Sequence, residues 1–236
     1  MRNSKQAIVL TGAPGSGKST ILERMQEGFS MREGVSAQAV ETGRLLRRAA
    51  EEETELGREV RPYLEEGKLA PTQLVNRIVE QAVRGADSSL LLFDGYPRNR
   101  AEVRHLRKME EEGLFGPAVV VVLHLSRETA VKRISGRRKC PGCGSTYNVH
   151  YDPPRRPDTC DRCDGALEQR EDDRPEVVEK RLDVFEAETL PAIEDFQALR
   201  PQSTINLSAE NSLDTVLEAA GRLLEKTGVD LEAHRG

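Results

Sequence analysis

Short, mainly apolar runs alternate with longer amphipathic segments along most of the chain. The runs cover Gln6–Thr11, Ser89–Asp94 and Ala118–Leu125, and Thr204–Leu207 is a weaker fourth run. Each run is short and bounded by glycine or polar residues, and several are rich in β-branched residues. This pattern predicts buried β-strands.

The segments between these runs carry apolar residues at helical spacing. In Thr42–Glu53, for example, Leu45, Leu46, Ala49 and Ala50 fall on one stripe. The other predicted helices are Lys18–Gln26, Glu55–Glu66 with Gly67 as C-cap, a helix from Pro71 through Val83, Arg127–Gly136, a helix from Arg174 with Asp172 or Asp173 as N-cap, and Ser212–Thr227. Strands alternating with helices predict an α/β fold, with a parallel sheet covered by helices on both faces.

Residues 136–173 break the pattern, because their apolar periodicity vanishes while Arg, Pro, Gly, Cys and Asp become frequent. Such a segment cannot bury enough apolar surface to fold alone. It contains all four cysteines of the chain, Cys140, Cys143, Cys160 and Cys163, in the pattern C-x₂-C-x₁₆-C-x₂-C. This spacing is typical of a zinc ribbon. Four thiolates leave no open coordination position, so we predict structural zinc, with a catalytic metal or a redox dithiol as alternatives.

A glycine-rich stretch after the first predicted strand suggests a phosphate site. Gly12–Ser19 matches G-x-x-x-x-G-K-[ST] and lies between a predicted strand and a predicted helix. The glycines let backbone N–H groups converge on phosphate oxygens, and the helix N-terminus adds partial positive charge. Lys18 can reach terminal phosphates, and the Ser19 hydroxyl suits Mg²⁺. The alternative is a glycine-rich turn without a ligand.

A second motif, Asp94-Gly95-Tyr96-Pro97-Arg98, follows the next buried run. Open α/β sheets bind ligands at the carboxyl ends of their strands. Asp94 could orient magnesium and its waters, and Arg98 presents a planar fork suited to phosphate. An ordinary turn with a capping aspartate is the alternative.

Six motifs occur in order: GAPGSGK, TG-x-x-x-R, EGKL, DGYPR, GRR-x-C-x-x-C and R-x-D-D…KRL. In these motifs the sequence resembles adenylate kinases and related nucleoside monophosphate kinases, in the form that has a long zinc-bearing lid. The resemblance covers nearly the whole chain. It implies a P-loop NTPase-type fold, and reversible transfer of the γ-phosphoryl group from ATP·Mg²⁺ to AMP, giving two ADP.

The resemblance also implies roles for individual residues. The donor nucleotide would be held by Gly15, Ser16, Gly17, Lys18, Ser19, Thr20, Arg133, Arg137, Thr146 and Tyr147. The acceptor would be bound by Thr42, Arg47, Lys68, Leu69, Ala70, Gly95, Tyr96, Pro97, Arg98, Glu102, Arg170 and Arg181. The residues around the transferring group would be Lys18, Asp94, Arg98, Arg133, Arg137, Arg170 and Arg181. Positive charge at this point is what phosphoryl transfer requires.

Three of these assignments have alternatives in the sequence itself. Arg181 shares a helical stripe with apolar residues, which indicates an anionic partner, either a substrate or a structural salt bridge. Arg137 could belong to a solvated basic turn. Tyr147 could simply pack within the ribbon.

The resemblance divides the chain into three parts. Residues 1–40, 71–135 and 174–236 would form the core, residues 41–70 an acceptor-binding insertion, and residues 136–173 the zinc-binding lid. Closure of the two insertions would exclude water, which otherwise competes with the acceptor phosphate.

The chain departs from the family pattern at three places. Glu102 stands where glutamine is usual, and a carboxylate matches the donor edge of guanine better than adenine. This favours GMP, unless Glu102 is an exposed helix acid. Arg44 stands where aspartate is usual, and the loop at Ser208–Asn211 differs in length from the usual pattern.

Composition limits the remaining possibilities. The 236 residues carry a net charge of −5, which argues against nonspecific nucleic-acid binding. No apolar run approaches the roughly 20 residues that span a bilayer, and the polar first residues predict no secretory signal. We therefore expect a cytoplasmic monomer acting on nucleotides. The alternatives are a kinase for another small acceptor and a non-catalytic nucleotide-binding protein, regulatory or RNA-associated.

Overall fold

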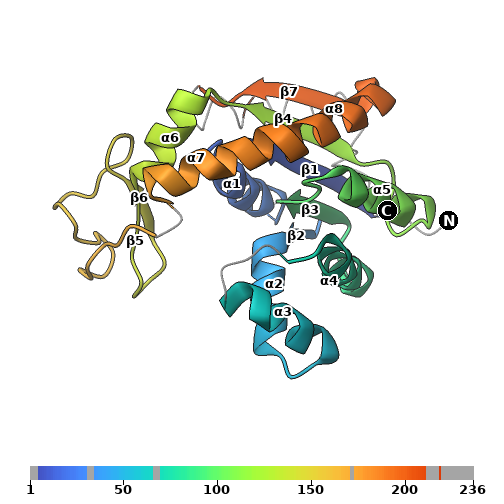
Figure 1. Ribbon diagram of the computed structural model, residues 1–236, viewed down its shortest axis with the longest axis horizontal. Coiled ribbons are helices and arrows are strands. Elements are labelled where there is room, and N and C mark those ends of the chain that lie inside the picture. Colours follow the sequence, from blue (N-terminus) through green and yellow to red (C-terminus); the bar gives the residue numbers. More distant parts are fainter. Residues whose placement is uncertain (1–4, 31–34, 66–69, 171–172, 211–217, 219–236) are drawn as a thin grey trace.

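A computed structural model gives the fold of the chain and describes residues 5–30, 35–65, 70–170, 173–210 and 218. A parallel sheet with helices on both faces forms the centre, while a pair of helices and a loop-rich lid project from it at separate places (Figure 1). This arrangement confirms the predicted α/β class.

The central sheet has the strand order β2-β3-β1-β4-β7, and all neighbouring strands are parallel. Its strands are β1 (Gln6–Gly12), β2 (Ala37–Glu41), β3 (Leu90–Asp94), β4 (Val119–His124) and β7 (Thr204–Ser208). The sequence predicted four of these and missed β2. Only Val40 is buried in this edge strand, so no continuous apolar run marks it.

Helices cover both faces of the sheet, as expected for a parallel sheet. They are α1 (Lys18–Ser30), α4 (Thr72–Gly85), α5 (Arg100–Glu111), α6 (Arg127–Ser135), α7 (Pro175–Val184) and α8 (Leu190–Leu199). Alternate strand residues face opposite layers. Val9 and Phe93 pack in one cluster with residues of α4, α5 and α8, whereas Ile8 and Leu92 pack in the other with residues of α1.

The projecting helix pair consists of α2 (Thr42–Glu51) and α3 (Glu55–Glu65). Its apolar stripe is the predicted one: Leu45, Leu46 and Ala49 pack with Val60 and with the start of α4 in a separate small cluster. The predicted C-cap Gly67 lies outside the described residues.

The lid contains one short antiparallel hairpin, β5 (Arg137–Lys139) with β6 (Thr146–Asn148), which the sequence did not predict. Its described core cluster is small, with Cys140, Cys160 and Leu167 buried at the centre. The expectation that this segment lacks an apolar core of ordinary size is therefore confirmed for the described residues.

A π-helix, η2 (Phe185–Thr189), connects α7 and α8 without a break. The predicted helix after residue 174 is confirmed, but its capping by Asp173 was wrong. Arg174 is the N-cap residue, no side chain caps the helix, and Asp173 instead pairs with arginine. Asp172 and the predicted helix Ser212–Thr227 lie outside the described residues, apart from the single helical position 218. Within the described part, no helix is long and apolar enough to cross a membrane.

Candidate nucleotide site and metal centre

The glycine-rich loop joins β1 to α1, as the motif predicted. Gly12, Gly15 and Gly17 all have φ between 81° and 143°, the region that favours glycine. At Gly12 an added Cβ would lie 2.3 Å from the carbonyl oxygen of Leu123 in the neighbouring strand. Glycine is therefore required where the loop leaves the sheet.

Lys18 lies within this loop. Its ammonium donates to the carbonyl oxygens of Gly12 and Ala13, both at 2.9 Å, and to Ser16 Oγ at 3.3 Å. Burial is the main cause that lowers the pKa of Lys18 to about 8. The nearby positive charges of Arg98 and Arg181 also lower this pKa, whereas the negative charge of Asp94 raises it. These charges therefore converge on one place, and a phosphate there would favour the charged form of the ammonium.

Ser19 and Asp94 come together from different elements. The Ser19 hydroxyl at the start of α1 donates to Asp94 Oδ2 at the end of β3, at 2.7 Å. A hydroxyl beside a carboxylate supplies the hard oxygen ligands that Mg²⁺ prefers. The two residues predicted to bind or orient magnesium are thus neighbours in space.

The DGYPR segment follows β3. Gly95 has a φ of 75°, and its carbonyl oxygen accepts hydrogen bonds from Arg98 Nε (2.9 Å) and from Thr42 Oγ1 (3.1 Å). Two predicted acceptor contacts, far apart in sequence, therefore meet beside the phosphate loop. Of the others, Arg47 is exposed, Ala70 packs against the core, and Lys68 and Leu69 lie outside the described residues.

Glu102 is 4% exposed and caps α5. Its Oε2 accepts from the Arg98 N–H (2.7 Å) and its Oε1 from Asn99 Nδ2 (3.1 Å), while Asn99 Oδ1 accepts from the Glu102 N–H (3.0 Å). This is a variant of the capping box. The interpretation of Glu102 as an exposed helix acid was therefore wrong, and burial raises the pKa of its carboxyl.

The other departure from the pattern, Arg44, contacts Glu41, the residue that precedes α2. Arg44 thus forms an ion pair at the helix start and is otherwise exposed.

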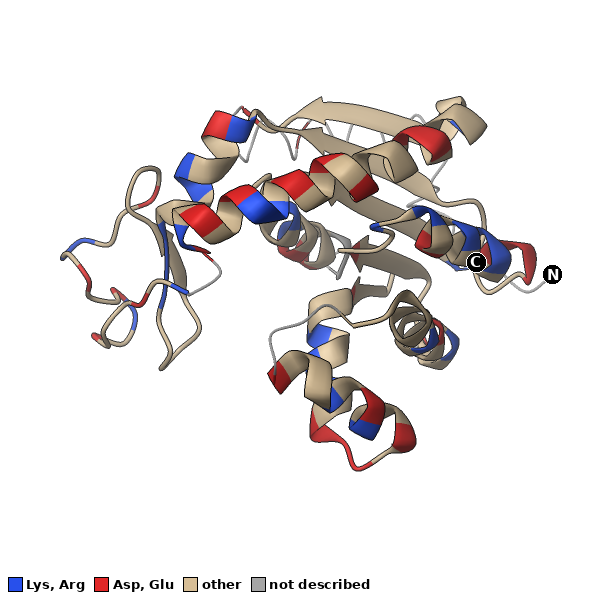
Figure 2. Cartoon of the chain, viewed as in Figure 1, with Lys and Arg blue, Asp and Glu red and all other residues tan. Residues whose placement is uncertain are grey.

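Asp173 gathers two of the predicted catalytic arginines. Its carboxylate is fully buried and accepts from Arg137 through both oxygens, with Nε at 2.8 Å, while Arg181 Nη1 lies 3.9 Å away. The interpretation of Arg137 as part of a solvated turn was wrong, whereas the predicted salt bridge of Arg181 is present. Figure 2 shows how acidic and basic residues mix along α7 around this point.

Arg133, Arg170 and Thr146, which were also predicted for the site, lie outside this arginine–aspartate group. Arg133 Cζ lies 5.5 Å from the ring centre of Tyr151, and Arg170 is exposed, with its carbonyl accepting from the Asp173 N–H. Thr146 is exposed on β6. The structure brings neither Arg170 nor Thr146 side chains into the arginine–aspartate group.

A cavity of about 300 Å³ opens at the carboxyl ends of β1, β4 and β7, next to the phosphate loop. Among its lining residues are Gly12, His124, Arg127, Phe185 and Glu210. Clefts at this edge are where open α/β sheets bind ligands. Glu210 belongs to the loop whose length departs from the usual pattern, and it accepts from the Ser126 N–H at 2.6 Å.

The four cysteines converge in the lid. Their sulfur atoms all lie within 4.8 Å of one another, with Cys140–Cys163 at 3.4 Å and Cys143–Cys160 at 3.5 Å. A tetrahedral zinc with Zn–S bonds of about 2.3 Å places sulfurs about 3.8 Å apart, so the donor set fits zinc.

Tyr147 contacts this cluster. Its hydroxyl accepts from the Asp161 N–H (2.9 Å) and can therefore donate to Cys160 Sγ at 3.4 Å. This hydrogen bond is the main cause that lowers the pKa of Cys160 to about 6, which favours the thiolate a metal needs. The packing interpretation of Tyr147 thus accounts for its hydroxyl.

Sequence reasoning missed two residues of the site, Asp173 and Asn99. Asn99 had a local signal, because an N-cap asparagine with glutamate three residues later is a known helix start. Asp173 had none beyond its place in the R-x-D-D motif, since its partners come from other elements.

Comparisons with known proteins agree with this geometry. A family model described as adenylate kinase matches residues 10–200. The chain is 36% identical over 212 residues to an adenylate kinase of Caldanaerobacter subterraneus subsp. tengcongensis, covering 89% of this chain and 92% of that protein. It is 37% identical over 218 residues to an adenylate kinase of Pyrococcus furiosus, covering 92% and 95%. With the phosphate loop, the segment Gly95–Arg98 and the four clustered cysteines in place, the chain belongs to the adenylate kinase family.

Proposed function

We propose that the protein is an ATP:AMP phosphotransferase, which reversibly transfers the γ-phosphoryl group of ATP to AMP and gives two ADP. The carrying observation is the meeting of Lys18, the Ser19–Asp94 pair and the Thr42–Arg98 pair at one edge of the sheet. The relatives named adenylate kinase support the same activity.

In this proposal the chain positions two phosphate chains and stabilises the charge between them. The loop N–H groups and Lys18 hold the donor phosphates, and Arg98 holds the acceptor phosphate. Bound Mg²⁺ supplies charge neutralisation at the donor phosphates, and Ser19 and Asp94 hold it. Arg137 and Arg181 pair with Asp173 in this structure. In the proposed reaction they face the transferring group and stabilise its negative charge.

The same proposal assigns the three parts of the chain. Residues 1–40, 71–135 and 174–236 form the core, residues 41–70 bind the acceptor, and residues 136–173 close over the donor. Zinc in the four-cysteine site has a structural role, because four protein thiolates leave it no open position. It stabilises a lid whose described apolar cluster is small, with Arg137 at the edge of that lid.

For the acceptor base we propose adenine. The argument for guanine requires Glu102 oxygens that accept from the base, but both oxygens already accept hydrogen bonds from the start of α5. To bind guanine through Glu102, the base would have to reach a carboxylate that is only 4% exposed and held in the helix cap.

A coupled assay with ATP·Mg²⁺ and AMP, GMP, CMP or UMP in turn tests the proposal. We expect ADP formation with AMP well above the acceptor-free rate. Lys18→Met should reduce it by at least about a hundredfold, because a charge at the phosphates is lost. The exposed Lys108→Met is the matched control. ADP formation that no monophosphate increases would refute the kinase proposal, and a preference for GMP would refute the choice of base.

A further inference from the structure

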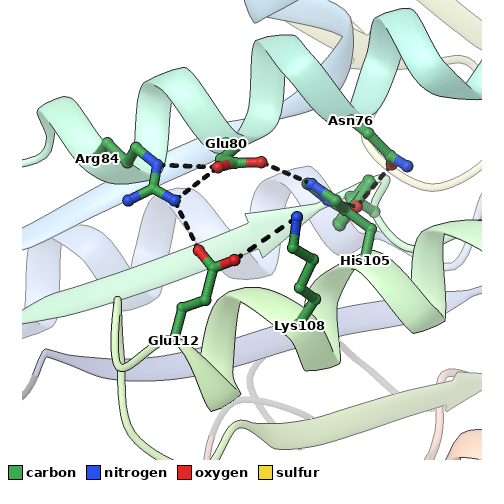
Figure 3. Close-up of polar contacts among 7 residues, drawn as sticks. Asn76, Glu80, Arg84, His105, Lys108 and Glu112 are labelled. Atoms are coloured by element: carbon green, nitrogen blue, oxygen red, sulfur yellow. Dashed lines mark hydrogen bonds and ion pairs between the residues drawn. The ribbon is translucent and has the colours of Figure 1, made fainter.

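A chain of polar contacts runs between α4 and α5 (Figure 3). It begins at Tyr96 in the loop Gly95–Arg98, which we call the acceptor loop. At its inner end, Tyr96 Oη lies 2.8 Å from Asn76 Oδ1 and 2.7 Å from His105 Nδ1. The other ring nitrogen of His105, Nε2, lies 2.9 Å from Glu80 Oε2. Asn76 and Glu80 belong to α4 and His105 to α5, so one tyrosine hydroxyl joins both helices.

The outer end of this chain consists of charged residues at the surface. Arg84 Nη2 contacts both Glu80 Oε1 and Glu112 Oε2 at 2.7 Å, and Lys108 lies 3.6 Å from Glu112. Exposed pairs of this kind are worth little individually. The buried Glu102 also lies close enough to Tyr96 to influence it.

Tyr96 connects this chain to the acceptor loop. Its side chain is 1% exposed, and it lies two positions before Arg98 in the loop Gly95–Arg98. The same loop is bonded to α5 a second time, through the Arg98 N–H and Glu102. The hydroxyl of Tyr96 and the carboxylate of Glu102 therefore fix the loop from two sides.

The number of protons in the chain limits its hydrogen bonds. Hydrogen bonds from Arg84 and then His105 lower the pKa of Glu80, so it is a carboxylate and only accepts. His105 Nε2 must then carry a hydrogen. Burial raises the pKa of Tyr96 above its ordinary value, so the hydroxyl keeps its single hydrogen.

Two arrangements satisfy these conditions. If His105 is neutral, Nδ1 accepts from the Tyr96 hydroxyl, and Asn76 must present its NH₂ group to Tyr96 Oη. If His105 is protonated, Nδ1 donates to Tyr96 Oη, and the hydroxyl donates to Asn76 Oδ1. In both arrangements the Tyr96 hydroxyl joins Asn76 of α4 to His105 of α5.

We propose that Tyr96 and His105 are positioning residues for the acceptor nucleotide, and that their hydrogen bonds fix the loop Gly95–Arg98 between α4 and α5. This rests on the proposed function, since it takes Arg98 as the acceptor-phosphate residue. The donor phosphates are held by the separate loop between β1 and α1, so the effect is confined to the acceptor.

Steady-state kinetics of the full chain test the positioning role. Tyr96→Phe keeps the ring and removes the hydroxyl, and His105→Gln removes the imidazole that joins Tyr96 to Glu80. Each should raise KM for AMP about threefold to tenfold, the value of one buried hydrogen bond, and leave KM for ATP unchanged. Lys108→Gln, at the outer end of the chain and 64% exposed, is the matched control.

The split between the two substrates separates positioning from general destabilisation. Equal changes in both KM values, or an unaltered KM for AMP in Tyr96→Phe, would overturn the proposal.

A second measurement needs no variant to fold and no assay to succeed. In ¹⁵N NMR spectra of the wild type, His105 Nε2 should carry a hydrogen, because its partner Glu80 is a carboxylate that only accepts. An Nε2 without a hydrogen would refute this chain of contacts. If the wild type showed no AMP-dependent ADP formation, the proposed function would fail, and these spectra would still decide whether the chain of contacts forms.

Discussion

Replacing Glu102 tests whether the main role of this residue is to cap helix α5. Its carboxylate accepts two hydrogen bonds at the start of α5, and its side chain is buried against the acceptor loop. Glu102→Ala removes both acceptors. The Arg98 N–H then loses its partner in a place that water reaches poorly, while the Asn99 amide keeps Thr72 Oγ1 as an acceptor at 3.2 Å.

The magnitude follows from these contacts. Losing a helix cap costs about 0.5–2 kcal/mol, and a buried donor left unpaired costs about 1–3 kcal/mol. Because the two terms describe partly the same bonds, we expect the free energy of unfolding to fall by about 2–3 kcal/mol. In a chain of this size each kcal/mol lowers Tm by about 2–4 °C, so Tm should fall by about 4–12 °C.

Differential scanning calorimetry of the wild type, Glu102→Ala and Glu111→Ala measures this effect. Glu111 lies at the other end of α5, and its side chain is 68% exposed, with Arg107 at 3.5 Å. Its loss should change Tm by no more than about 2 °C, since an exposed pair contributes little. Equal Tm values for both variants would refute the capping role of Glu102.

The pH dependence of Glu102 has a defined sign. Because burial raises its pKa in the folded state above the ordinary value of 4.5, the folded protein binds the proton more tightly than the unfolded chain does. Above the folded-state pKa, the charged carboxylate therefore lowers the free energy of unfolding by its full amount. As pH falls from the folded-state pKa towards 4.5, this destabilisation disappears. Relative to Glu102→Gln, which cannot titrate, the wild type should gain stability on acidification. A parallel pH dependence of the two proteins would contradict this sign.

Three further predictions concern the phosphate loop, the four-cysteine site and the buried carboxylate of Asp173. Gly12→Ala should prevent folding or strongly lower Tm, because its Cβ would meet a carbonyl at 2.3 Å, whereas Gly28→Ala in α1 should stabilise by about 0.5–1 kcal/mol in calorimetry. Chelation should lower Tm, and Tyr147→Phe should release zinc faster to a colorimetric chelator than Tyr151→Phe does; equal release rates would exclude a role for the Tyr147 hydroxyl. Asp173→Asn should lower kcat by at least about tenfold, because the arginines lose their buried partner, and an unchanged kcat would show that this pairing does not position them.

Sequence reasoning succeeded where one segment contains the whole cause of its structure. Strands β1, β3 and β4 are buried on both faces, so their continuous apolar runs identify them. The phosphate loop and the cysteines could be read from spacing, because ligand geometry restricts which residues can stand at which interval. Edge strand β2 and the lid hairpin lack such runs, and they form only against partners distant in sequence.

The contacts within the site were harder to predict. Nothing local indicates that Asp173 pairs with Arg137, thirty-six residues earlier, because only the fold brings the start of the lid to the start of α7. Glu102 shows a different difficulty. Comparison with a family motif suggested a base contact, while its local sequence, an asparagine followed by a glutamate three residues later, indicated the cap that the structure contains.

The π-helix η2 between α7 and α8 changes which side of this continuous helix faces its neighbours. An additional residue within a helix rotates everything beyond it by about 100° about the axis. On one side of η2 the helix carries Arg181 beside Asp173, and on the other side Ile193 and Phe196 are buried in the core. Deleting one residue of Phe185–Thr189 would put the two halves out of phase. The core would keep its end of the helix, and Arg181 would turn away from Asp173.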